Sequence, residues 1–166
     1  MPKRFDLISI TILLLAFIVL YYPIWITEYV YTDEVVQLWY YGKQPGFEMF
    51  FQQGRYITEL LMQWLFGSID TIKEIKFIRI FSFLGWILAL PVWYYGLKSI
   101  FIKEGFPVMG AFFCTLYLIC MPPLKISVVW ASCLELFLAN TTGFLSGYFM
   151  YRAIKIRDNR VQVSSR

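Results

Sequence analysis

The sequence predicts an all-α polytopic membrane protein, with about four transmembrane helices and an outer loop that carries amphipathic surface helices. Hydrophobic residues make up 59% of the 166 residues and aromatic residues 20%, whereas charged residues make up only 16%. A soluble domain of this length has too little interior to hide so much apolar surface. The charges are also clustered, and the uncharged gaps between them reach the roughly 20 apolar residues that a helix needs to cross the hydrocarbon.

We expect a single membrane module over residues 1–166. Its first span covers residues 7–26, which hold no charge and end in the interfacial aromatics Tyr21, Tyr22 and Trp25. The basic start also fits a signal peptide, but the apolar stretch is long and lacks a small-residue cleavage site, which favours a retained anchor. The other expected spans cover residues 77–97, 105–124 and 126–151.

Basic residues concentrate at both ends of the chain and between the second and third expected spans. They are Lys3 and Arg4 at the N-terminus, Lys98 and Lys103 between the spans, and Arg152, Lys155, Arg157, Arg160 and Arg166 in the tail at 152–166. Because basic residues near span ends mark the cytoplasmic side, both termini should be cytoplasmic, and residues 27–76 should form an outer loop. The net charge of +4 then reflects membrane orientation, and we expect no nucleic-acid partner.

Histidine is absent from the sequence, which excludes Ser-His-Asp and Cys-His catalysis and argues against most zinc sites. The three cysteines, Cys114, Cys120 and Cys133, lie in expected spans without a metal-binding spacing, and we interpret them as packing residues. The candidate functional residues are therefore carboxylates and cations.

Two adjacent carboxylates, Asp33 and Glu34, follow the first span within about two helical turns of the membrane surface. Such a pair can hold a divalent cation, or one member can act as a base toward a hydroxyl group. Asp33 can equally cap a helix that runs through Val35 and Trp39. Spacing alone leaves these roles open and favours the cap.

A short amphipathic helix is predicted between Gly54 and Gly67, because apolar residues recur there with helical spacing. The stretch is too short to span, so we expect it to lie flat on the outer leaflet. Arg55 would begin this helix. Its guanidinium can pair with a lipid-linked phosphate or with Glu59 one turn further on, and the sequence favours neither.

A second basic group approaches the membrane at the end of the outer loop. Asp70 should cap the helix that becomes the second span, and Lys73, Lys76 and Arg79 follow it at intervals of three. These three side chains share roughly a third of the helix circumference. They can bind a phosphate, although extension toward lipid headgroups is the simpler interpretation.

Glu135 is the one carboxylate inside an expected span, where ionisable side chains are costly and usually face protein or water. We therefore expect it to mark a buried polar site. Further along the same span, Gly143 and Gly147 form a Gly-x-x-x-Gly pattern, which should allow close helix packing within the chain.

The order of these features resembles the N-terminal part of integral-membrane glycosyltransferases of the GT-C fold. This class includes protein O-mannosyltransferases and bacterial lipopolysaccharide-modifying glucosyl- and arabinosyltransferases. The resemblance rests on the basic N-terminus before the first span, on Thr32-Asp33-Glu34 just outside it, and on Gly54-Arg55-Tyr56 at the start of a surface helix. It implies a polyprenyl-phosphate-linked sugar donor, an envelope glycan or protein acceptor, and a location in the bacterial inner (plasma) membrane.

The resemblance also implies roles for individual residues. Asp33, together with Glu34, would deprotonate the acceptor or position a divalent cation. The position of Arg55, Lys73, Lys76 and Arg79 in the same outer loop or at its end makes these four residues the candidates for binding the donor phosphate. Because such enzymes usually have more spans, we expect the chain to be the N-terminal module of a longer or interrupted enzyme.

The alternative is a small non-catalytic membrane protein that binds or stabilises a partner complex. A third interpretation, a transporter subunit that uses Glu135 for ion coupling, is disfavoured by the long outer loop. Membrane lipid is a partner under every interpretation.

Overall fold

The computed structural model describes residues 3–26, 28–41 and 46–164, and these residues form helices without strands. Its long helices are α1 (Lys3–Tyr21), α6 (Ile75–Lys103), α7 (Val108–Cys120) and α9 (Leu136–Ser164). Between α1 and α6 lie α2 (Pro23–Ile26), α3 (Thr32–Val36), the π-helical η1 (Gln37–Tyr41), α4 (Glu48–Gln52), α5 (Tyr56–Gly67) and the 3₁₀ turn η2 (Ile72–Glu74). Helix α8 (Pro122–Val129) and the 3₁₀ turn η3 (Ala131–Cys133) connect α7 to α9.

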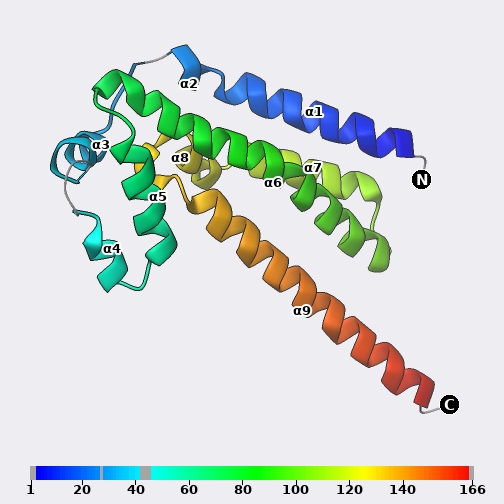
Figure 1. Cartoon of the computed structure of the whole chain (residues 1–166). Coiled ribbons are helices and arrows are strands. Elements are labelled where there is room, and N and C mark those ends of the chain that lie inside the picture. The colour runs from blue at the N-terminus through cyan, green and yellow to red at the C-terminus, as the bar shows by residue number, and fades with distance from the viewer. Residues whose placement is uncertain (1–2, 27, 42–45, 165–166) are drawn as a thin grey trace.

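The long helices run back and forth, and the short helices gather at one end of them (Figure 1). Helix α6 returns along α1, and α7 turns back along α6. Both termini lie at the end where α6 meets α7, opposite the short helices. We call the described parts of residues 28–74 the short-helix module.

Two helices are long and apolar enough to cross a membrane within the described residues, namely Arg4–Ile26 and Ile72–Lys103. Helices α7 and α8 add a third span only if the pair, which is bent by 53°, counts as one. The prediction of four spans is therefore wrong in number. Residues 126–151 do not form one helix, because α8 ends at Val129 and α9 begins only at Leu136.

Helix α9 does not qualify as a span, because polar residues interrupt its apolar half. These residues are Asn140, Thr141, Thr142 and Ser146. The second span is also longer than expected. Helix α6 continues to Lys103, so Lys98 lies within the helix, where its ammonium group pairs with the Asp6 carboxylate of α1 at 2.5 Å.

The bend between α7 and α8 follows from Pro122 and Pro123. Proline disfavours the helical conformation for the residue before it. Met121 is accordingly extended, with φ −71° and ψ 141°, and α7 ends at Cys120. The two prolines then occupy the first turn of α8, where a missing N–H group costs no helical hydrogen bond.

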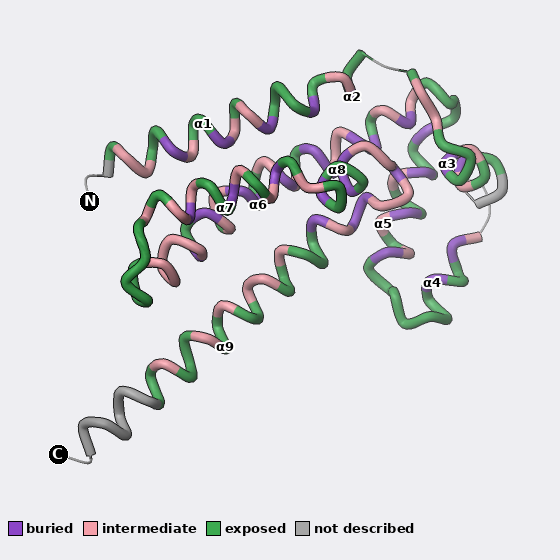
Figure 2. The backbone as a smooth tube through the Cα atoms, turned by 180° about the vertical axis from the view of Figure 1, so that it is seen from behind, coloured by how far each residue is buried: buried purple, intermediate pink, exposed green. Residues whose placement is uncertain are grey.

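Buried apolar side chains form two separate cores. The core of the long helices contains Leu13, Phe17, Tyr21, Ile24, Phe83, Trp86, Ala89, Leu90, Tyr94, Ile119, Leu124, Val128 and Phe137. The core of the short-helix module contains Leu38, Phe47, Phe50, Met62, Phe66, Ile69, Ile75, Ile78, Ala131 and Leu134. Phe81 packs against both, so the first turns of α6 lie between the two cores. Figure 2 shows that α9 contributes little buried surface beyond its start.

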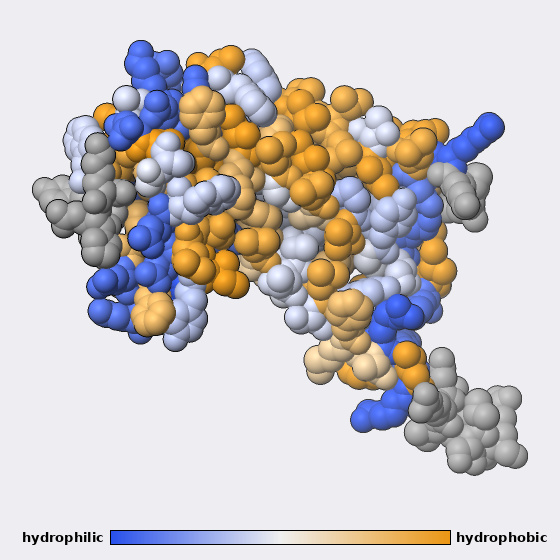
Figure 3. Space-filling model, in the orientation of Figure 1, coloured by the Kyte–Doolittle hydropathy of each residue, from blue (hydrophilic) through white to orange (hydrophobic). Residues whose placement is uncertain are grey.

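The visible surface is apolar in the middle and hydrophilic at its ends. Figure 3 shows hydrophobic residues gathered over the long helices, with hydrophilic residues on the short-helix module and toward the termini. Leu7, Leu15, Val19 and Leu88 are among the large apolar side chains exposed on α1 and α6. Such an exposed belt is expected where lipid rather than water surrounds the helices.

Helices α6 and α9 approach each other through glycines of α6. A Cβ atom on Gly85 would lie 2.5 Å from the Phe137 ring, and one on Gly96 would lie 2.6 Å from the Phe144 ring. By contrast, no atom lies within 4 Å of the Cβ positions of Gly143 and Gly147. The prediction that this Gly-x-x-x-Gly pair packs within the chain is wrong, because Phe137 and Phe144 fill the contact instead.

The predicted short amphipathic helix is α5, Tyr56–Gly67. Its exposed face carries Ile57, Leu60 and Trp64, whereas Met62 and Phe66 are buried in the core of the short-helix module. Figure 1 shows α5 running across the direction of α6. An exposed apolar stripe on such a helix is typical of a helix that lies on a lipid surface, and this placement stays a prediction.

Candidate functional site

The adjacent carboxylates Asp33 and Glu34 point to different surroundings. Both lie in the first turn of α3, where successive side chains are separated by about 100° around the helix axis. Glu34 is fully buried, with 0% of its side chain exposed, whereas Asp33 is exposed. The pair is therefore split into one structural and one accessible carboxylate.

Glu34 forms a buried ion pair with Arg79 of α6, whose side chain is 1% exposed. The Arg79 Nη2 group donates to Glu34 Oε2 at 2.5 Å, and its Nε group donates to Oε1 at 3.4 Å. The backbone N–H groups of Tyr31 and Ala131 donate to the same two oxygens, at 3.0 and 2.5 Å. The Arg79 guanidinium also lies 4.2 Å from the ring centre of Tyr29.

These contacts assign a structural role to both partners. The Glu34 carboxylate joins α3, α6 and η3, and neither of its oxygens is left to act as a base or to hold a cation. Arg79 is likewise enclosed and cannot reach a donor phosphate. We therefore withdraw the catalytic and cation-binding roles expected of Glu34 and the phosphate-binding role expected of Arg79.

Neither predicted aspartate cap is found. Tyr31 is the N-cap residue of α3, and Asp33 lies inside its first turn. At the next helix start, Thr71 is the N-cap residue of η2, and the Glu74 carboxylate accepts hydrogen bonds from the N–H groups of Asp70 and Thr71 at 2.7 and 3.0 Å. In both places a glutamate three residues inside the helix satisfies the free N–H groups instead.

Arg55 lies just before α5 and pairs with Glu135, 80 residues further along the chain. Gly54 makes the turn before it with φ +76°, a conformation that favours glycine. The Arg55 Nη2 group donates to Glu135 Oε1 at 2.5 Å, and the Thr58 hydroxyl group donates to the same oxygen at 3.4 Å. The observed protein partner of Arg55 is thus Glu135 and not Glu59.

The two members of this pair differ in exposure. The Arg55 side chain is 47% exposed, whereas that of Glu135 is 11% exposed. Glu135 Oε2 is buried without a hydrogen-bond partner among the described residues. Beside it lies a cavity of about 260 Å³, lined by Ile57, Thr58, Glu135, Leu138, Ala139 and Thr142. The expected buried polar site at Glu135 therefore sits between α5 and α9, with an apolar cavity next to it.

The charges of Asp33, Arg55 and Glu135 all act on the thiol of Cys133. Burial raises the pKa of this thiol, the carboxylates of Glu135, Asp33 and Glu34 raise it further, and Arg55 opposes them. No hydrogen bond or ion pair engages the Asp33 carboxylate within the part of the chain that the structure describes. We call Asp33, Arg55, Thr58 and Glu135 the Asp33–Arg55 site.

The predicted basic cluster does not assemble as one group. Lys73 lies 3.8 Å from Glu28, and both side chains are more than half exposed. The Lys76 ammonium group lies 5.8 Å from the ring centre of its neighbour Phe77. With Arg79 enclosed, Arg55 is the predicted phosphate-binding residue that shares a site with Asp33.

The residues present do not fit a divalent cation. Such an ion takes six or more oxygen ligands, and carboxylates supply the strongest of them. Within the described residues, no group of three or more Cys, Asp or Glu side chains is arranged to hold a metal ion. Both Glu34 oxygens are engaged, which leaves Asp33 as a single accessible carboxylate.

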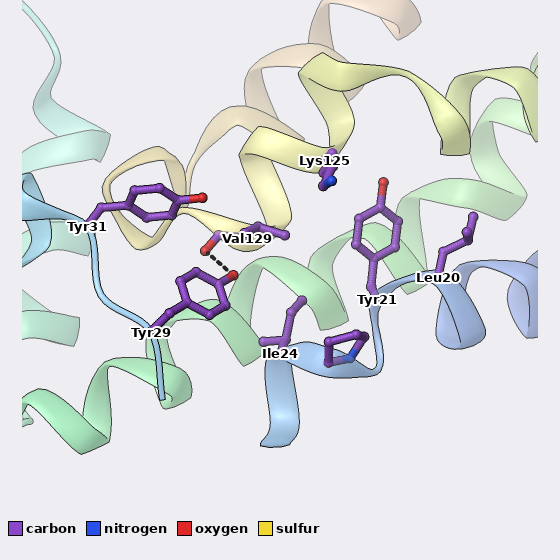
Figure 4. A pocket seen from close by; sticks show the side chains of 8 residues that line it. Leu20, Tyr21, Ile24, Tyr29, Tyr31, Lys125 and Val129 are labelled. Atoms are coloured by element: carbon purple, nitrogen blue, oxygen red, sulfur yellow. Dashed lines mark hydrogen bonds between the residues drawn. The ribbon is translucent and has the colours of Figure 1, made fainter. Parts of the chain in front are cut away.

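A second cavity, of about 390 Å³, lies between α1, α2 and α8 (Figure 4). Lys125 of α8 lines it. Sequence reasoning missed this residue, because a single lysine between two apolar runs looks like a span boundary. The preceding Pro122-Pro123, which predicts a broken helix, was the available signal.

Comparison with protein-family models, with curated proteins and with solved structures finds no match to this chain.

Proposed function

We propose that this chain forms the sugar-transfer module of a GT-C-like membrane glycosyltransferase, which uses a polyprenyl-phosphate-linked sugar as donor. The observation that carries the proposal is an exposed, unengaged carboxylate, Asp33, and a half-exposed guanidinium, Arg55, whose charges both act on the Cys133 thiol. The site lies where the short-helix module meets the long helices, the level at which a lipid-linked substrate presents its phosphate.

Asp33 acts as the general base in this proposal. It takes the proton of the acceptor hydroxyl group as that oxygen attacks the anomeric carbon of the sugar. The bond between the anomeric carbon and the phosphate oxygen breaks, and polyprenyl phosphate leaves with the electron pair. Such a base must reach the hydroxyl group directly or through one water, which an exposed carboxylate without an internal partner can do.

Arg55 binds the phosphate of the donor. A guanidinium has five N–H donors in a planar fork, and the contact with Glu135 uses one of its two terminal nitrogens. The remaining donors are available on a side chain that is 47% exposed. Glu135 holds the guanidinium in place from the buried side, which lowers the entropic cost of binding a phosphate.

Glu34 and Arg79 support the site without contacting the substrate. Their ion pair ties α3 to α6, so the direction of Asp33 is set by a rigid element. The cavity of about 260 Å³ next to Glu135 offers apolar walls from Ile57, Leu138 and Ala139 to a prenyl chain.

A second candidate function is partner binding without catalysis. It is favoured by the engagement of Arg55 and Arg79 in ion pairs within the chain, since both cations then have structural roles. In that case α5 would be a strut on the membrane surface, and Asp33 would be a solvated side chain.

The substitution Asp33→Asn separates the two functions. Membranes that contain the protein are supplied with a radiolabelled polyprenyl-phosphate sugar, and transfer to envelope glycan and protein is measured. We expect transfer to fall by about 100-fold or more, the effect of removing a general base, while protein level and thermal stability stay unchanged. Glu28→Gln, an exposed carboxylate earlier in the same segment, is the matched control and should transfer normally.

Near-normal transfer by Asp33→Asn at normal protein level would refute the catalytic role. Absence of transfer by the wild-type protein, in membranes that carry the donor, would contradict the proposal and favour the partner-binding function.

A further inference from the structure

The cavity between α1, α2 and α8 combines apolar walls with one cation. Leu20, Tyr21, Pro23 and Ile24 line it from α1, α2 and the turn between them, Tyr29 and Tyr31 from the segment that follows, and Lys125 and Val129 from α8. Lys125 is the one charged residue in this lining. Figure 4 shows its ammonium group between the hydroxyl groups of Tyr31 and Tyr21.

The Lys125 ammonium group has no anionic partner among the described residues. The cavity lining contains no acidic residue, and the acids of the segment that follows α2 have other partners, because Glu28 pairs with Lys73 and Glu34 pairs with Arg79. Lys125 is exposed, so its ammonium group is accessible to an anionic ligand that enters the cavity, and the apolar walls beside it strengthen the attraction between the two charges.

Tyr31 provides a hydrogen-bond donor beside this cation. The Tyr21 hydroxyl group donates to the Ile119 carbonyl oxygen at 2.8 Å, and that of Tyr29 donates to the Val129 carbonyl oxygen at 3.2 Å. Burial raises the pKa of the Tyr29 phenol, so it remains a donor at neutral pH. The Tyr31 hydroxyl group has no such acceptor in the described chain, and its ring is held 5.3 Å from the ring centre of Trp130.

The lining of the cavity, which is apolar with one cation, suits a phospholipid. Lys125 precedes the end of α8 at Val129 by one helical turn, a rise of roughly 6 Å. The cavity lies where α1 ends and the short-helix module begins, because its lining includes Leu20 and Tyr21 as well as Tyr29 and Tyr31. Leu20 and Ile24 can pack against an acyl chain, whereas a free phosphate ion would leave these apolar walls unmatched.

We infer that this cavity binds the phosphate of an anionic phospholipid, with Lys125 as the counter-ion, Tyr31 as a hydrogen-bond donor and the acyl chain against α1 and α2. The site is separate from the Asp33–Arg55 site and does not depend on the proposed sugar transfer. Its effect is to fix the start of the short-helix module to one lipid.

Native mass spectrometry of the purified protein tests this inference, with dioleoylphosphatidylglycerol and dioleoylphosphatidylcholine as probes. We expect the wild-type protein to retain phosphatidylglycerol in preference to phosphatidylcholine. Lys125→Gln should weaken this retention about fivefold, the factor associated with one lysine near an anionic lipid surface. Tyr31→Phe should weaken it less and keep the ring contact with Trp130. Inorganic phosphate should not displace the lipid.

Two matched controls separate this site from other basic positions. Lys73→Gln removes an exposed lysine from the same end of the molecule, and Arg55→Gln removes the cation of the Asp33–Arg55 site. Both should retain phosphatidylglycerol as the wild type does. Equal retention by Lys125→Gln and wild type, or displacement by inorganic phosphate, would overturn the inference.

Discussion

The substitution Arg79→Met tests how much the buried ion pair between Glu34 and Arg79 contributes to stability. The side chains of Glu34 and Arg79 are 0% and 1% exposed, and 2.5 Å separates their charged atoms. Without Arg79, the buried carboxylate keeps only the backbone N–H groups of Tyr31 and Ala131. Breaking a buried ion pair from one side costs about 3–5 kcal/mol, because the remaining charge is uncompensated. We expect a loss of that size in the free energy of unfolding.

The double variant Glu34→Gln with Arg79→Met distinguishes charge imbalance from lost packing. Each single substitution leaves one buried charge without its oppositely charged partner, whereas the double variant removes both charges. It should therefore be more stable than the sum of the single effects predicts, by about 2 kcal/mol. This recovery identifies electrostatic coupling, since a cavity alone would give additive losses.

The assay is an SDS titration of the protein in mixed micelles, followed by circular dichroism. Lys73→Met is the matched control, because Lys73 and Glu28 form an exposed pair at 3.8 Å. Such a pair contributes at most about 1 kcal/mol. If Arg79→Met proves no more destabilising than this control, the assignment of Glu34 and Arg79 to a buried structural pair is wrong.

Two further predictions concern the surroundings of the site. Asp33→Asn should lower the pKa of Cys133, because the substitution removes a negative charge that disfavours the thiolate. In a variant whose other two cysteines are replaced by serine, maleimide should then modify Cys133 faster. An unchanged rate would place Asp33 away from the site. A spin label at Ile57 should contact lipid while one at Gln63 contacts water, and equal water exposure at both positions would exclude a surface role for α5.

Composition and periodicity were sufficient to predict an all-helical chain with helices long and apolar enough to cross a membrane, and the short helix α5, because both depend on the local apolar pattern. They failed at residues 126–151, where an apolar run is read as one span. The run is broken at Trp130, and the N–H group of Ala131 is taken by Glu34, 97 residues away in the chain. No local pattern can report such a contact.

The same limit applies to the candidate site. The sequence shows that Asp33, Arg55 and Glu135 are unusual, and in the structure the charges of all three act on the Cys133 thiol. The sequence does not show that Glu34 is enclosed. Which of two adjacent helical residues is buried depends on how α3 packs against α6. The roles of two neighbouring acids therefore depend on a tertiary contact with Arg79.

Binding of undecaprenyl phosphate to the purified protein tests the proposed donor site at Arg55, because it needs neither acceptor nor turnover. Native mass spectrometry compares the wild type with Arg55→Gln, Asp33→Asn and Lys73→Gln. A donor site at Arg55 predicts that Arg55→Gln loses about tenfold in affinity, the size of one charge-assisted contact, while Asp33→Asn and Lys73→Gln bind as the wild type does. Unchanged binding by Arg55→Gln would contradict the assignment of the donor phosphate to this residue.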